Sequence, residues 1–154
     1  MKDYKYIGKD VIRIDALEKI SGAAIYGDDI DFGPNLLYAE LVQSTMAHAI
    51  IKSIDTSAAL KVKGVYKIFT GMDFPYKFGL YMKDRYIFAQ DKVRFVGEQI
   101  AAVIAFSPGA AKRAAELVKV DYEPLPAVLN QMDALQDDAT LLHPDLADYP
   151  HVPW

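Results

Sequence analysis

Arg94, Glu98 and Gln99 flank Gly97 between two predicted strands, and they form the most promising polar group in this 154-residue sequence. A glycine at this point allows a tight turn or a close approach of another backbone. One interpretation is an ion pair between the arginine and the glutamate that fixes the turn. The other is that these four residues contact another domain. The two interpretations have equal weight, and catalysis by these residues ranks well behind both.

The three histidines, His48, His143 and His151, are the other residues that could do acid–base or metal chemistry. They lie far apart in the sequence and form no H-E-x-x-H pattern, so a metal site is not expected. His48 lies between two alanines near the start of a predicted strand and could serve as a general base. Because no nucleophile motif accompanies it, a packed or hydrogen-bonded structural histidine is the favoured interpretation. The other two histidines are assigned no role.

Several other kinds of site are excluded or disfavoured. The sequence contains no cysteine, which excludes disulfides, thiolate catalysis, and zinc or iron–sulfur sites with cysteine ligands in this chain. The glycines at 22 and 27 do not form a phosphate-binding pattern. Asp28, Asp29 and Asp31 could suggest calcium, but the EF-hand spacing and its closing glutamate are absent. A solvated turn with capping aspartates is therefore favoured.

The composition is that of one soluble globular domain, with 52% hydrophobic and 25% charged residues. The net charge of −4 gives no sign of nucleic-acid binding, which usually needs a basic surface. The sequence has no run of about 18 apolar residues that would span a membrane. Its first residues also lack the apolar stretch of a signal peptide. We therefore expect a cytoplasmic protein without nucleic-acid or membrane partners.

The elements that position these residues are mainly strands. Runs of β-branched, aromatic and alternating apolar residues predict six of them. They lie at 36–44, 49–54, 65–69, 93–96, 99–105 and 119–123. The run at 99–105 is almost wholly apolar, as expected when both faces of a strand are buried. Residues 1–35 are polar and rich in turn residues, so we predict an extended arm with a short strand or two.

The clearest predicted helix runs over about 107–118. Ser107 is a suitable N-cap and Pro108 suits the first helical position, while apolar residues at 110, 114, 117 and 118 form one stripe. A short helix is predicted at about 56–60. The aromatic-rich stretch at 76–91 is expected to be a long loop that in part faces a partner.

Mixing of helices and strands without strict alternation indicates an α+β fold with a mixed sheet. We expect a single domain over residues 1–145, of which 1–35 is the arm, and a C-terminal tail at 146–154.

Taken in order, several segments resemble the N-terminal domain of the molybdopterin-binding large subunit in the xanthine dehydrogenase, aldehyde oxidase and carbon monoxide dehydrogenase family. They include RIDALEKISGAAIYGDDI at 13–30, STMAHAII at 44–51, KVRFVGEQIAAV at 92–103 and VDYEPLP at 120–126. The resemblance covers residues 7–145. Gln99 departs from it, because the family commonly has proline after the Gly-Glu pair.

The resemblance implies the α/β hammerhead fold. Complete enzymes of this family use a molybdenum–pterin cofactor, iron–sulfur clusters and often FAD to hydroxylate or oxidise small substrates with water. Their molybdenum-contacting residues, catalytic glutamate and cluster cysteines lie in other domains, so none is carried over to this chain. The resemblance therefore implies no cofactor here. The implied partners are a molybdopterin-binding domain or subunit, with the iron–sulfur and flavin subunits of the same complex.

Two functions are compatible with this sequence. The first is a structural or interaction domain, or split subunit, of a molybdenum hydroxylase-type oxidoreductase, which supports the catalytic molybdopterin domain and is not catalytic alone. A natural short subunit and a piece of a longer chain both fit it. The alternative is a stand-alone binding or assembly module without redox activity, of which a carrier modified at Lys19 is a subtype. Exposed apolar surface would favour the first.

Overall fold

The computed structural model describes residues 4–80 and 82–146, and the chain divides between Leu36 and Leu37 into two compact units. Except for Leu146, the predicted tail at 146–154 lies outside the described residues, as does His151. None of the helices in the described ranges has the length and hydropathy of a membrane span.

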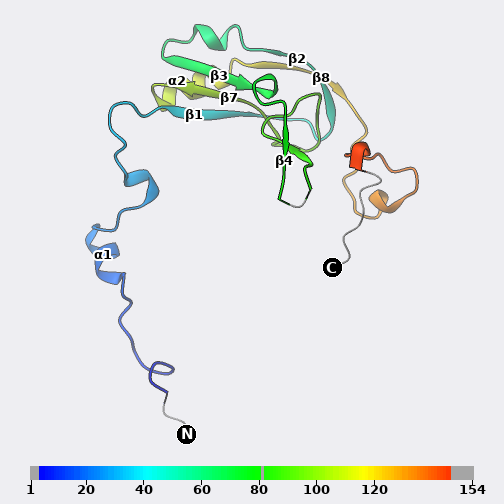
Figure 1. The fold of residues 1–154 in the computed structure, drawn as a ribbon. Helices are drawn as coiled ribbons and strands as arrows, with labels where there is room; N and C mark the ends of the chain where they lie inside the picture. Colours follow the sequence, from blue (N-terminus) through cyan, green and yellow to red (C-terminus); the bar gives the residue numbers. More distant parts are fainter. Residues whose placement is uncertain (1–3, 81, 147–154) are drawn as a thin grey trace. The chain divides into compact units, whose positions relative to one another are not determined.

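The first unit, described from residue 4 to residue 36 and called the N-terminal segment below, is held by local contacts (Figure 1). Its helix α1 (Ala16–Ser21) ends at Gly22, whose φ of +73° suits glycine. A 3-10 turn, η1 (Gly27–Asp29), follows. The prediction of strands here is wrong: residues 4–36 contain none, because capping contacts close helical turns instead.

The second unit is built on β7 (Gln99–Ala105), the central strand of a three-stranded antiparallel sheet (Figure 1). Its neighbours are β1 (Tyr38–Gln43) and β3 (Val65–Thr70). Five of its seven residues are buried, which confirms the strand with two buried faces that its apolar run predicts.

Helix α2 (Pro108–Ala115) lies against this sheet (Figure 1). Its buried residues are the small side chains Ala110, Ala111 and Ala114. The main-chain N–H of Ala110 donates to Oγ of Ser107 at 3.3 Å, so the predicted N-cap is confirmed. Ala114 is buried against Val103 of β7. The helix ends three residues before the predicted 118, because i→i+3 bonds from Leu117 and Val118 tighten the chain toward the next strand. Leu117 is consequently exposed rather than part of the buried stripe.

A second antiparallel sheet has the order β6 (Lys92–Val93), β2 (Ala49–Asp55) and β8 (Lys119–Pro124). The core beneath it contains Ala49, Ala89, Val93 and Ile100. Pro124 lies within β8 instead of following it, which an edge strand tolerates because its outer N–H groups have no ladder partner.

Shorter elements complete the second unit. The aromatic stretch predicted as a loop contains a hairpin, β4 (Lys77–Phe78) with β5 (Arg85–Tyr86). The predicted helix at 56–60 is reduced to turns and η2 (Ala59–Lys61), and the remaining 3-10 turns are η3 (Gly71–Asp73), η4 (Asp133–Leu135) and η5 (Pro144–Leu146). The α+β class is confirmed, but the ladders found in the described residues are antiparallel rather than mixed.

Candidate functional site

Arg94 and Glu98 form the base of the loop between β6 and β7. The main-chain N–H of Arg94 donates to the Glu98 carboxylate, and the Arg94 guanidinium lies 3.8 Å from the same carboxylate. The two side chains are only 10% and 14% exposed, so little water screens the pair. The sequence could not choose between an ion pair and an inter-domain contact. In the structure the ion pair is present, and its geometry fixes the turn.

The backbone of Gly97 forms hydrogen bonds that join this loop to the end of β1. Its N–H donates to the carbonyl of Ser44 at 2.8 Å, and its own carbonyl accepts from Nε2 of Gln43 at 3.0 Å. Its φ of +90° is a backbone conformation that residues other than glycine rarely adopt. Gln99 opens β7, and its carbonyl accepts from the N–H of Ala89 at 2.7 Å. Contact of Arg94, Gly97, Glu98 and Gln99 with another domain stays a prediction.

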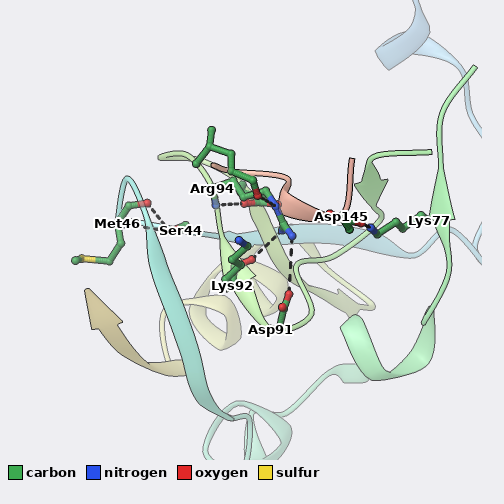
Figure 2. A network of polar contacts seen from close by, with 9 residues as sticks. Ser44, Met46, Lys77, Asp91, Lys92, Arg94 and Asp145 are labelled. Atoms are coloured by element: carbon green, nitrogen blue, oxygen red, sulfur yellow. Dashed lines mark hydrogen bonds and ion pairs between the residues drawn. The ribbon is translucent and has the colours of Figure 1, made fainter. Parts of the chain in front are cut away.

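The Arg94 guanidinium also reaches two main-chain carbonyls, as Figure 2 shows for Lys92. Its Nη1 donates to the carbonyl of Lys92 at 3.2 Å, and its Nε donates to the carbonyl of Leu142 at 3.4 Å. Nη2 lies 4.0 Å from the Asp91 carboxylate. Two nitrogens of this buried cation therefore donate hydrogen bonds inside the domain, and Nη2 has an acidic neighbour.

A shallow pocket of about 260 Å³ lies beside this arginine. It is lined by Lys77, Tyr86, Asp91, Lys92, Arg94, Pro144 and Asp145. Lys77 is hydrogen-bonded to the Asp145 carboxylate, which raises the pKa of Lys77 and lowers the pKa of Asp145 (Figure 2). An amine with a raised pKa stays protonated and is a poor nucleophile. The contact instead holds η5 against the hairpin strand β4.

Phe95 and Val96 form the tip of the same loop, and they are 55% and 63% exposed. Sequence reasoning concentrated on the charged residues and missed this pair. The sequence gives no signal for their exposure, because Phe88 and Val93, of the same residue types, are buried in the core. A rigid loop that exposes an aromatic side chain can anchor a protein interface.

His48 is a structural histidine, as favoured from the sequence. It is only 3% exposed, and its Nδ1 lies 2.7 Å from the carbonyl of Pro126. Since a carbonyl only accepts, Nδ1 is the donor in this hydrogen bond. Burial lowers the pKa of His143, which sits between Leu142 and η5.

The aspartates of the N-terminal segment cap turns, as predicted. The Asp29 carboxylate accepts from the N–H of Tyr26 at 2.9 Å, and the Asp31 carboxylate accepts from the N–H of Gly33 at 2.7 Å. Across residues 4–80 and 82–146, no group of three or more His, Cys, Asp or Glu side chains is arranged to hold a metal ion.

Comparison with known proteins gives a consistent result. Residues 21–126 match the family model described as aldehyde oxidase and xanthine dehydrogenase, a/b hammerhead domain. The chain is 36% identical to the nicotinate dehydrogenase large molybdopterin subunit of Eubacterium barkeri, over 94% of this chain and 34% of that protein. It is 43% identical to the xanthine dehydrogenase/oxidase of Rattus norvegicus, over 86% of this chain and 10% of that protein.

Among solved structures, reconstituted CO dehydrogenase from Oligotropha carboxidovorans superposes with a TM-score of 0.84 at 36% identity. The superposition covers 92% of this chain and 18% of that chain. The chain thus spans about a third or less of the relatives that it matches.

Proposed function

The chain belongs to the aldehyde oxidase and xanthine dehydrogenase family, whose hammerhead domain it matches, and from this membership we propose a supporting role in a molybdenum hydroxylase. In this role the chain is an interaction domain or split subunit that packs against the catalytic molybdopterin-binding part of the enzyme and is not catalytic alone. The observation that carries the proposal is the superposition on CO dehydrogenase, which covers 92% of this chain but only 18% of that chain.

The chemistry of the described residues supports a non-catalytic role. Arg94 and Glu98 are engaged with each other, and Lys77 is engaged with Asp145. The proton on Nδ1 of His48 is directed at a carbonyl. These charged and titratable groups stabilise the domain, so we assign no catalytic step to them.

The donor set of this chain does not fit an iron–sulfur cluster. Such clusters are held by cysteine thiolates, and the chain has no cysteine. The described residues also offer no cluster of metal ligands. We therefore place the iron–sulfur clusters in partner domains or subunits, and from the family membership we propose the same for the molybdenum–pterin cofactor and, where present, FAD. The part of the large molybdopterin subunit of Eubacterium barkeri that this chain does not match, about two thirds of its length, illustrates the kind of partner that we expect.

Affinity purification of the tagged chain from its native cells tests this proposal, with molybdenum analysis of the eluate and mass spectrometry of its proteins. We expect a molybdenum-bearing polypeptide together with iron–sulfur or flavin proteins. An abundant chain that elutes alone and metal-free contradicts the proposal. That result favours the alternative, a stand-alone binding or assembly module without redox activity.

A further inference from the structure

The N-terminal segment, residues 4–36, exposes its large apolar side chains instead of burying them. No residue in this range is buried. Ile12 and Ile14 are 89% and 101% exposed. Others with the same character are Ile7, Val11, Leu17, Ile20, Ile25 and Phe32. Large apolar side chains that are exposed together on a soluble protein mark an interaction site.

The backbone of this segment nevertheless has a defined local conformation. The Asp15 carboxylate accepts from Nε of Arg13 at 2.5 Å and pairs with Nζ of Lys19 at 2.7 Å, which frames the start of α1. At the other end, the N–H groups of Ala23 and Ala24 both donate to the carbonyl of Glu18. Local contacts alone rarely stabilise a helix of six residues, because isolated helices of fewer than about 12 residues are marginal in water. The segment therefore needs a surface that covers its apolar side chains.

The comparison with CO dehydrogenase indicates where that surface lies. Residues 37–154 make up about three quarters of this chain, whereas the superposition covers 92% of it. A large part of the N-terminal segment therefore has a counterpart in that solved chain. Because this chain corresponds to only 18% of that polypeptide, most of the homologous enzyme is available to cover the segment.

We propose that the N-terminal segment is a docking segment, which buries Ile12, Ile14 and their apolar neighbours in an apolar groove of the molybdopterin-binding polypeptide. The identity of the partner rests on the proposed function. Apolar contacts spread along an extended segment are typical of segments that become ordered on a partner.

Photo-crosslinking in the native cells tests the docking directly. The full chain carries p-benzoylphenylalanine in place of Ile12 or, in a second variant, Ile14, and the control carries it in place of Leu129, which is 86% exposed in the second unit. We expect cross-links from positions 12 and 14 to the molybdenum-bearing polypeptide. Cross-links to residues 37–146 of the same chain, to a second copy, or at no more than the level of the Leu129 control overturn the proposal.

A charge-insertion pair separates this inference from the proposed function. The double variant I12D/I14D is compared with L129D by the molybdenum that copurifies with each. Both keep the fold, since the replaced side chains are exposed. We expect I12D/I14D to recover at least about tenfold less molybdenum than the wild type, because two buried isoleucines are lost from the interface. Equal recovery by the wild type and both variants overturns the docking segment alone. No molybdenum with the wild type overturns the proposed function as well.

Discussion

Replacing Glu98 with alanine tests whether the buried ion pair holds the β6–β7 loop. The variant removes the charged acceptor of the Arg94 N–H, a hydrogen bond of a kind that contributes about 1.5–3 kcal/mol. It also leaves the Arg94 guanidinium, which is only 10% exposed, without its nearest carboxylate. Breaking a buried pair in this way costs about 3–5 kcal/mol. Because Arg94 keeps its bonds to the carbonyls of Lys92 and Leu142, we expect the lower end, about 3 kcal/mol.

Urea unfolding followed by circular dichroism measures this loss as a fall of about 1–2 M in the midpoint. Glu123→Ala is the matched control, because Glu123 pairs with Lys52 at 2.6 Å but both side chains are about half exposed. Exposed pairs contribute little to stability, so the control midpoint should barely move. If Glu98→Ala and Glu123→Ala shift the midpoint equally, the reasoning from burial is refuted.

Three further predictions concern the second unit of the chain, which begins at Leu37. Gly97→Ala would make only an ordinary contact at 4.0 Å with Nε2 of Gln43, but its φ is +90°, so it should cost about 1–2 kcal/mol in thermal unfolding, and no loss would contradict the assigned turn. Ile100→Ala should cost about 2–5 kcal/mol because Ile100 is fully buried, whereas Ile12→Ala at an exposed site should leave urea unfolding of the isolated chain unchanged. An NMR titration should give His143 a pKa below 6.5, because burial disfavours its charged form. Since the unfolded state then binds the proton more readily, His143 should destabilise the fold as the pH falls below about 6.5, and a pKa above that value would contradict its placement.

The parts of the fold that sequence reasoning predicted well are those with a local signal. Ser107 and Pro108 mark the start of α2, and the apolar run ending at Ala105 marks the buried strand β7. The order of the matching segments also predicted the family. Each of these signals is contained in a few neighbouring residues or in their order along the chain.

The features that escaped prediction depend on contacts between distant residues. The strands β1 and β3 pair antiparallel with β7 because of the direction in which the chain returns to the sheet. The sequence of a single strand does not determine that direction. The turns of the N-terminal segment arise from the Gly22 C-cap of α1 and from the contact of the Asp29 carboxylate with the N–H of Tyr26, which compete with the strands that turn-rich sequences also allow. The sequence allowed either an ion pair or an inter-domain contact for Arg94 and Glu98. Only the structure shows that the two side chains are buried and paired with each other.

The structure adds an exposed apolar tip to the charged loop that the sequence singled out. Charged residues drew attention to the loop between β6 and β7, while the exposed side chains of Phe95 and Val96 at its tip were overlooked. Exposure of an apolar residue is a property of the tertiary structure, since the same residue type fills the core elsewhere in the chain. The inter-domain contact at Arg94, Gly97, Glu98 and Gln99 stays a prediction.

We propose that this chain supports a molybdenum hydroxylase and does not form the complete enzyme by itself. The most direct measurement is native mass spectrometry of the complex purified through this chain, combined with molybdenum content per copy. We predict one copy of the chain bound to a molybdopterin-containing polypeptide, close to one molybdenum per copy in the complex and none in the chain separated from it. A complex without molybdenum, or a chain present only by itself, would contradict the account.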